Sequence, residues 1–414
     1  MAEEGTKSNV SILPEGQGIQ VKATIDNFYK LISNHYKDKI RLNDMTGKPE
    51  YWNKLRNCWC EWTDAQESEA RAYFESTYGM YSQAKLADAL AIYFKDHKVN
   101  PLINILESLE WDGKPRVEQF LHDIMKAEDT DYIRECSRLI FAGGIHRAYE
   151  PGCKFDDMIV LIGDQSAGKS TIVRWLSLQD EFFREIKTIN GKEGIETIRG
   201  VWIGEVAELM AMTRVKEAEA VKAYITSQED SYRPPYAKHV ITVPRRCMFI
   251  GTTNNPQFLT DKTGNRRFYP VKCQSHAYRM YDHEEEIKGY IRQAWAEAVH
   301  LYKEGKLQPF ARKEVLEQIR AAQEAAMEDD WRTGAIMQFL DDQKKHNGAT
   351  TCVIELWHKA LNEPEESKPT RKDSIEICQI ISSVPGWIQG PNKISTPWGR
   401  QKYFRKDNFY AIWR

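Results

Sequence analysis

The sequence predicts an α/β fold in which short buried strands alternate with helices, and three apolar stretches support this prediction. The first, Met158–Ile162, precedes a glycine-rich turn and a segment with helical apolar spacing. The second and third lie within 201–208 and 245–255, and both carry polar residues near their carboxyl ends. Continuous apolar runs are typical of strands covered on both faces, so we expect these strands to form a parallel sheet.

The chain has 414 residues, of which 41% are hydrophobic and 29% are charged, as in an ordinary globular protein. Its 58 Lys and Arg residues nearly balance 60 Asp and Glu residues, giving a net charge of −2. This balance excludes a protein that holds nucleic acid by overall positive charge, but it allows a local basic surface. The polar start and the lack of a long apolar run predict a cytoplasmic protein without a membrane segment. The eight cysteines include no C-x-x-C pair, so we expect reduced thiols and no zinc site.

Changes in composition and pattern divide the chain into four parts. We expect a small α+β region at 1–99, a helical segment at 100–150, a core of alternating strands and helices at 151–332, and a basic C-terminal domain at 333–414.

The glycine-rich turn after Met158–Ile162 fits the phosphate-binding motif G-x-x-x-x-G-K-[ST] in full. Its glycines let backbone N–H groups and the N-terminus of the following helix surround phosphate groups. We expect Lys169 to reach the β- and γ-phosphates and Ser170 to bind Mg²⁺ through its hydroxyl group. The sequence therefore predicts a P-loop that binds ATP and Mg²⁺. The expected nucleotide-binding residues are Gly163, Asp164, Gln165, Ser166, Ala167, Gly168, Lys169, Ser170 and Thr171.

Two carboxylates near the end of the 201–208 strand are candidates for the chemistry of hydrolysis. A P-loop enzyme needs acids at this position, one to orient Mg²⁺ and one to polarise the attacking water. Glu205 and Glu208 do not form an adjacent pair, so the pattern leaves open which does which. We favour Glu208 as the catalytic and metal-associated residue. The alternative is that both are solvent-facing strand residues.

Polar residues after the third strand and a pair of arginines complete the predicted site. Asn254 stands where an ATPase places an asparagine that senses the γ-phosphate and aligns water. Arg266 and Arg267 lie between a turn and a strand, where one of them could reach the ATP of a neighbouring subunit as an arginine finger. The alternatives are a strand that ends in asparagine without a function and a solvated pair of arginines.

Taken in order, these motifs resemble the virulence-associated protein E family of phage and genomic-island proteins, whose ATPase is similar to that of superfamily 3 helicases, a branch of the AAA+ type. The resemblance implies a ring-forming, hexameric, ATP-driven DNA helicase or translocase that replicates mobile elements in a bacterial host, with 100–150 as a collar-like segment. The matching segments are 110–116, 151–156, the P-loop, 201–209, 252–255 and 264–268.

The segment 232–243 reads as a hairpin with Lys238 and His239 near its tip. It resembles the Lys-His hairpin that papillomavirus-type replicative helicases direct into the ring channel, which implies that these two residues contact DNA. Because the hairpin joins the strand that bears Glu208 to the strand that ends in Asn254, we expect both of its ends to lie near the γ-phosphate. A solvated hairpin is the alternative.

The C-terminal part is locally basic, with nine Lys and Arg residues against three acids from Lys368 to Arg414. Its order of two helices and two strand-like pieces suits a winged helix with 398–402 in the wing. A small lid on the ATPase with a solvated basic face is the alternative.

Together these signals predict an ATP-dependent DNA helicase or translocase with an α/β P-loop core, a helical N-terminal region and a small winged-helix-like C-terminal domain. The expected partners are single-stranded or forked DNA, further copies of the chain in a ring, and a separate primase or replication protein. A separate primase is expected because the N-terminal part is short and shows no clustered catalytic acids. A DNA-binding initiator or interference factor that uses ATP as an assembly switch is the alternative. A P-loop small-molecule kinase is the third interpretation.

Overall fold

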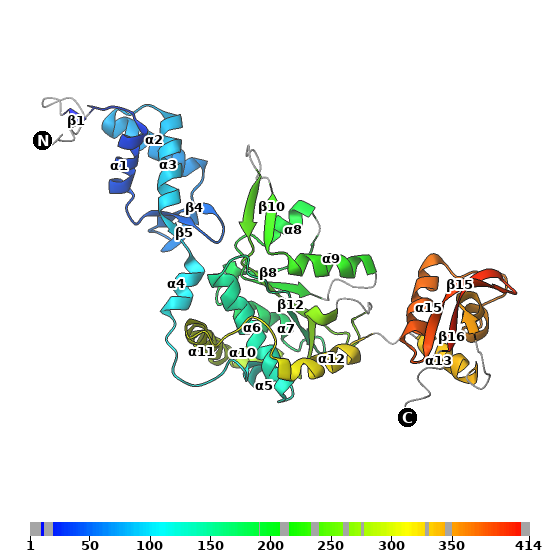
Figure 1. Cartoon of the computed structure of the whole chain (residues 1–414). Coiled ribbons are helices and arrows are strands. Elements are labelled where there is room, and N and C mark those ends of the chain that lie inside the picture. Colours follow the sequence, from blue (N-terminus) through cyan, green and yellow to red (C-terminus); the bar gives the residue numbers. More distant parts are fainter. Residues whose placement is uncertain are drawn as a thin grey trace, which may run out of the picture. The chain divides into compact units, whose positions relative to one another are not determined.

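The computed structural model divides the chain into two compact units, Met1–Met327 and Glu328–Arg414, and each is considered by itself (Figure 1). Among the helices that the structure describes, none combines the length and apolar character that a membrane crossing needs. The finer division of the first unit at 99 and 150 stays a prediction. The described residues are 10–11, 20–189, 191–207, 215–232, 240–259, 265–274, 277–327, 331–343 and 350–406.

The first unit begins with a short strand pair and a small α+β region. Three helices pack on a four-stranded sheet of order β5-β4-β3-β6, in which only β3 and β6 are parallel. Phe28, Phe74 and Tyr93 are among the fully buried side chains of its core. The elements are β1 (Val10–Ser11), β2 (Gln20–Val21), α1 (Ile25–His35), β3 (Ile40–Asn43), β4 (Lys48–Asn53), β5 (Cys58–Glu61), α2 (Asp64–Tyr78), α3 (Gln83–Asp96) and β6 (Lys98–Val99).

Three helices follow, α4 (Pro101–Ser108), α5 (Phe120–Met125) and α6 (Asp131–Tyr149). Nearly every residue of α6 is buried, charged ones included, as expected of a helix enclosed on all sides. It packs against α11 (Glu284–Lys303) and against strands of the central sheet. The hydrophobic core that joins α6, α11 and the sheet contains Phe141, Trp202 and Trp295.

The central sheet has five strands in the order β13-β7-β12-β9-β8, and all neighbouring strands are parallel. The expected buried parallel sheet is therefore confirmed. Because the strands run in one direction, their carboxyl ends meet at one end of the sheet, called here the carboxyl end, and their starts meet at the amino end. The strands are β7 (Met158–Ile162), β8 (Phe183–Glu185), β9 (Ile203–Ala207), β12 (Met248–Thr253) and β13 (Phe268–Lys272).

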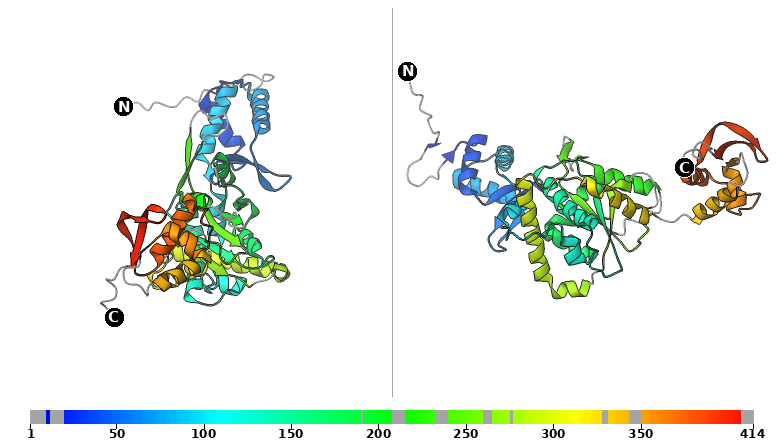
Figure 2. Two further views of the ribbon diagram at one scale, coloured as in Figure 1. Left: turned by 90° about the vertical axis from the view of Figure 1, so that its right-hand side faces the viewer. Right: turned by 60° about the horizontal axis from the view of Figure 1, so that its bottom comes forward.

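Helices flank this sheet in the two further views of Figure 2. The connection from β7 to β8 contains α7 and η1, and those from β8 to β12 contain α8 and α9. The helices after β13 complete the unit. These elements are α7 (Lys169–Leu176), η1 (Asp180–Phe182), α8 (Gly191–Thr197), α9 (Val215–Thr226), η3 (Asn265–Arg267), α10 (Ala277–Asp282), η4 (Lys313–Val315) and α12 (Leu316–Ala325).

An antiparallel hairpin of β10 (Glu229–Tyr232) and β11 (Ile241–Pro244) leaves the amino end of the sheet. Its base is closed by the Arg245 N–H, which donates to the Gln228 carbonyl at 2.8 Å, and Arg245–Cys247 then lead into the first residue of β12. The expectation that both ends of the hairpin lie near the γ-phosphate is wrong. The reason is that α9 carries the chain back along the sheet before β10 begins.

The second unit combines helices with a three-stranded antiparallel sheet of order β14-β16-β15. Its core contains Ile336, Leu356, Ile377 and Phe404. The long β15–β16 pair has an irregular register between Gln389 and Lys393. The elements are α13 (Trp331–Gln343), β14 (Thr350–Cys352), α14 (Val353–Glu355), η5 (Leu356–Ala360), α15 (Arg371–Ser383), β15 (Trp387–Thr396) and β16 (Gly399–Lys406).

Candidate nucleotide and DNA sites

The P-loop connects the buried strand β7 to the start of α7, at the carboxyl end of the sheet. Gly168 takes a left-handed backbone conformation (φ +79°) that glycine adopts without strain, and it is the residue before the helix. A side chain at Gly163 would meet the Cys273 carbonyl oxygen at 2.9 Å, so the close approach of this backbone requires glycine. The two glycines of the motif thus have local structural reasons that agree with a phosphate-binding loop.

Lys169 lies within the loop, and its side chain is buried among backbone and side-chain acceptors. Its ammonium group donates to the carbonyls of Gly163 at 2.7 Å and Asp164 at 2.9 Å, and to the Asn254 side-chain oxygen at 2.8 Å. Since β12 lies between β7 and β9, its carboxyl end places Asn254 directly beside the loop. Two residues selected independently from the sequence are therefore in contact.

Glu205 of β9 contacts the Ser170 hydroxyl group and is only 2% exposed. Its Oε1 accepts hydrogen bonds from the Ser170 hydroxyl at 2.5 Å and from the Thr252 hydroxyl at 2.7 Å. Burial raises the pKa of Glu205, while these two hydrogen bonds oppose the shift. A carboxylate and hydroxyl groups are hard oxygen donors of the kind that Mg²⁺ prefers.

Among the two candidate glutamates, the structure brings Glu205 into the site, whereas Glu208 lies outside the described residues. The structure does not test the preference for Glu208, which is kept below as the second candidate. Sequence reasoning did not single out Thr252, although it lies in the polar end of the third strand. The signal that could have identified Thr252 is its position in the same strand, two residues before Asn254.

Arg266 and Arg267 lie in η3, just before β13, and therefore at the amino end of the sheet. In the register of β13 with β7, Phe268 pairs with Met158, five residues before the P-loop begins. At about 3.3 Å per residue, roughly 17 Å of strand separates these arginines from the P-loop of the same chain. The structure thus does not bring the two arginines to the P-loop of their own subunit.

The Asp157 carboxyl lies in the same region as Arg266. Burial raises the pKa of Asp157 to about 6, opposed by a hydrogen bond with Tyr269 and by the positive charge of Arg266. Arg266 is exposed and Arg267 is partly buried. The charge of the Asp157 carboxyl group, near Arg266 at the amino end of the sheet, therefore changes with pH around 6.

Arg245 holds the two strands of the β10–β11 hairpin together at their base. Its guanidinium is 3% exposed and donates to the Asp230 carboxylate, with the Nε–Oδ2 distance at 2.9 Å. It also lies 4.8 Å from the centre of the Tyr224 ring. Arg147 of α6 adds a hydrogen bond to the Phe155 carbonyl at 3.1 Å and another to the Arg245 carbonyl at 3.4 Å, so the hairpin base is fixed to the core.

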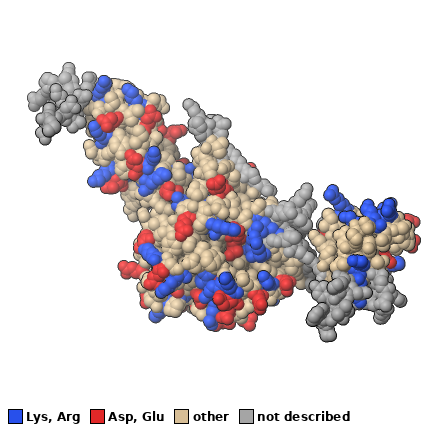
Figure 3. Space-filling model, in the orientation of Figure 1, with Lys and Arg blue, Asp and Glu red and all other residues tan. Residues whose placement is uncertain are grey.

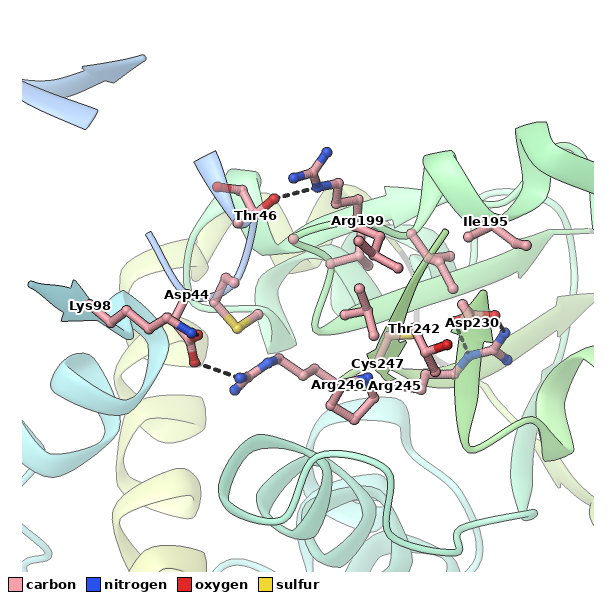
Figure 4. A pocket seen from close by; sticks show the side chains of 18 residues that line it. Asp44, Thr46, Lys98, Ile195, Arg199, Asp230, Thr242, Arg245, Arg246 and Cys247 are labelled. Atoms are coloured by element: carbon pink, nitrogen blue, oxygen red, sulfur yellow. Dashed lines mark hydrogen bonds and ion pairs between the residues drawn. The ribbon is translucent and has the colours of Figure 1, made fainter. Parts of the chain in front are cut away.

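A cavity of about 380 Å³ is lined by residues of this hairpin base and of the N-terminal α+β region (Figure 4). Arg246 reaches across it to the Asp44 carboxylate at 2.5 Å, and Lys98 lies 3.8 Å from the same carboxylate. On another side Arg199 donates to the Thr46 carbonyl. The N-terminal region thus contacts the segment that leads from the hairpin into β12. Lys238 and His239, expected at the hairpin tip, lie outside the described residues.

The second unit carries a basic surface on its β15–β16 pair. Lys393 and Lys402 are cross-strand partners and both are exposed, with Arg400 next along the same face. Like charges directly opposite each other destabilise a strand pair unless an anion lies between them. In Figure 3, several Lys and Arg side chains (blue) lie on the upper edge of this unit. The acids of α15 are paired within the unit, since Arg332 lies 2.7 Å from the Glu376 carboxylate and 3.7 Å from the Asp373 carboxylate.

A P-loop between a buried parallel strand and a helix, with an asparagine and a carboxylate from the next two strands beside it, is the arrangement of a P-loop ATPase domain. Residues 106–328, more than half of the chain, match the family described as the Virulence-associated protein E-like domain. The chain belongs to this family, and the resemblance noted from the sequence is confirmed.

Comparison with solved structures adds the fold of nearly the whole chain. The apo structure of the NrS-1 C-terminal region aligns over 92% of this chain and 98% of that chain, with 12% identity and a TM-score of 0.54. An A-form apo structure of the same region covers 93% and 99%, with 12% identity and a TM-score of 0.54. At this identity the likeness concerns the fold alone. A search of curated proteins found no match.

Proposed function

We propose that this protein is an ATP- and Mg²⁺-dependent DNA helicase or translocase of a phage or another mobile genetic element, acting in DNA replication. The observation that carries the proposal is the convergence of Lys169, Ser170, Glu205 and Asn254 at the carboxyl end of the sheet. In P-loop ATPases the lysine binds the β- and γ-phosphates, the serine binds Mg²⁺, and polar groups from neighbouring strands orient the attacking water.

The residues present fit ATP and Mg²⁺. Ser170 and Glu205 offer oxygen donors within 2.5 Å of each other. Among the described residues, no group of three or more His, Cys, Asp or Glu side chains is placed to hold a metal ion. Mg²⁺ is bound in such sites through one or two protein oxygens, phosphate oxygens and water. When bound, Mg²⁺ would neutralise charge that develops on the phosphates.

Glu205 is the carboxylate that we assign to this work, because its side chain already contacts the proposed Mg²⁺ ligand. Its charge would orient either the metal's water ligands or the attacking water. Glu208 follows the same strand and is the second candidate. Exchanging each glutamate for glutamine separates the two assignments.

A ring of subunits would complete the site. Arg266 or Arg267 lies too far along the sheet to serve its own P-loop, so an arginine finger from either would act on the ATP of a neighbouring subunit. The homo-oligomeric, hexameric arrangement of the AAA+ or superfamily 3 type, which the family resemblance implies, would bring such an arginine to a neighbouring P-loop. Hydrolysis would then depend on assembly.

Two regions would hold DNA. Lys238 and His239 are proposed to contact the backbone from the tip of the β10–β11 hairpin, whose base the structure describes. The second unit has the element order of a winged helix, since α13, β14, α14–η5 and α15 precede the β15–β16 pair. In that arrangement α15 would approach DNA and the basic pair Lys393–Lys402 would contact phosphates.

The test compares the full chain with Lys169→Ala. We expect the wild type to hydrolyse ATP with Mg²⁺, to be stimulated by forked DNA, and to displace a labelled strand, and we expect Lys169→Ala to do none of these. An ATPase that binds DNA but displaces no strand would instead support the second candidate, an initiator or interference factor that uses ATP as an assembly switch. The basic β15–β16 surface favours that candidate as well, because it suits binding at a fixed DNA site.

A further inference from the structure

A cavity of about 900 Å³ opens beside the P-loop, along the exposed side of α7. Ser170, Thr171 and Glu205 line one part of it, and residues of α10 and α11 line another. A nucleotide whose phosphates lie on the P-loop must place its sugar and base in the adjoining space. Because Ser170 and Thr171 lie at the end of the P-loop and the start of α7, this cavity adjoins the phosphate site.

An exposed aromatic ring stands where the cavity meets the P-loop. The Tyr281 hydroxyl group lies 3.2 Å from the Thr171 hydroxyl group, and the side chain is 57% exposed. Trp175 of α7 contacts the tyrosine ring edge to face, with ring centres 5.8 Å apart and planes at 90°. An aromatic ring that is held by another ring but remains largely uncovered offers a stacking surface.

The surroundings of Tyr281 suit a purine base more than an apolar ligand. Glu284, Glu285 and Lys288 line the same cavity, and the Lys288 ammonium lies 5.6 Å from the centre of the Trp175 ring. Carboxylates accept hydrogen bonds from exocyclic amines, while the two aromatic rings offer apolar area. The remaining lining is largely polar and charged, which fits the hydrogen-bonding edge of a base better than it fits a wholly apolar ligand.

We propose that Tyr281 is the stacking partner of the adenine base of the bound nucleotide, in the cavity between α7 and α10–α11. This rests on the proposed function, because it requires the triphosphate on the P-loop. Tyr281 is thus a nucleotide-binding residue that follows no sequence motif. Stacking of a base on an aromatic side chain contributes affinity that the phosphates cannot supply.

The experiment measures binding by calorimetry for the full chain with two probes, Mg-ATP and Mg-tripolyphosphate, which shares the phosphates but has no base. The variants are Tyr281→Ala and Tyr281→Phe, and Tyr81→Ala is the matched control because Tyr81 is 71% exposed in the N-terminal region. We expect Tyr281→Ala to weaken ATP binding about tenfold, in the range of base–aromatic stacking, and to leave tripolyphosphate binding unchanged. Tyr281→Phe keeps the ring and should bind ATP within about threefold of wild type, as should the control.

The outcomes separate this inference from the proposed function. If Tyr281→Ala binds ATP like wild type, or loses affinity equally for both probes, the stacking role is wrong while the ATPase proposal stands. If the wild type binds neither probe, both proposals fall. An ATP loss in Tyr281→Phe as large as in Tyr281→Ala would assign the effect to the hydroxyl group that contacts Thr171, and would overturn stacking.

Discussion

Replacing Glu205 by glutamine should abolish ATP hydrolysis without weakening the fold. The glutamine oxygen can accept both hydrogen bonds that Glu205 receives, from Ser170 at 2.5 Å and from Thr252 at 2.7 Å. The shape of the site is therefore kept, and only the negative charge is removed. Because burial raises the pKa of Glu205, the folded state pays for holding that charge, and the uncharged variant should be as stable as wild type or more so.

The expected loss of activity follows from the role of the charge. A positioned general base or a carboxylate that orients water contributes about 10²–10⁴-fold to a rate, which corresponds to about 3–5 kcal/mol of activation free energy. ATP binding should change little, since Lys169 and the loop are untouched. The assays are steady-state ATP hydrolysis, calorimetric ATP binding and urea unfolding on the same preparations.

The pH dependence gives a second test with a defined sign. An acid whose folded pKa is raised binds more protons when folded than when unfolded, so its presence lowers stability as pH rises from the unfolded pKa through the folded one. The free energy of unfolding of the wild-type protein should therefore fall as pH rises from the unfolded pKa of Glu205 to its folded pKa. That of Glu205→Gln should not show this fall. Hydrolysis by wild type should increase over the same window, because the ionised carboxylate is the active form.

One comparison decides between the two glutamates. If Glu208→Gln loses hydrolysis and Glu205→Gln retains it, the catalytic assignment made here is wrong. If Glu205→Gln unfolds at lower urea and fails to bind ATP, the residue is structural, and its contact with Ser170 serves the loop rather than the chemistry.

Three further outcomes are expected. Protein lacking either arginine of the 266–267 pair should regain hydrolysis when mixed with Lys169→Ala protein if that arginine acts in trans, and an absence of rescue for both would contradict a shared site. Because burial raises the pKa of Asp157 from 3.8 to about 6, the wild-type free energy of unfolding should fall by up to about 3 kcal/mol as pH rises from about 4 to 6. Asp157→Asn should lack this fall, and urea unfolding measured across this pH range tests the difference. Replacing both Lys393 and Lys402 by alanine should lower the salt slope of duplex binding by about 2 in anisotropy titrations while slightly stabilising the β15–β16 pair, and an unchanged slope would make the surface a merely solvated one.

Much of the central sheet could be read from the sequence, because its strands are covered on both faces and leave continuous apolar runs. The P-loop also has a local signature, since its glycines are required at Gly163 and Gly168 by close approach and by backbone conformation. The contact of Lys169 with Asn254 could be anticipated only as a shared end of the sheet. Strand order, which inserts β12 between β7 and β9, is set by packing that no single segment records.

Other features depend on contacts between distant segments and left no local signal. Tyr281 meets Thr171 only because α10 returns over the start of α7, and nothing in the residues around it marks a site. The hairpin was expected near the γ-phosphate because its neighbours in sequence are site strands. The crossover helix α9 instead moves the chain from the carboxyl end to the amino end before β10 begins.

The position of the hairpin changes how a motor of this kind would work. If ATP acts at the carboxyl end and DNA is held from the amino end, the two sites are separated by the length of β12, six residues or about 20 Å. This strand carries Asn254 at one end, in contact with Lys169, and is preceded by Arg245 and Arg246 at the other. Being buried along its whole length between two parallel strands, β12 cannot bend easily, so a shift at Asn254 would move the hairpin base as a rigid connection. Arg246, through its ion pair with Asp44, would pass the same shift to the N-terminal region. In the proposed helicase, β12 would therefore couple the nucleotide to the DNA, in place of a direct contact between the hairpin and the phosphate.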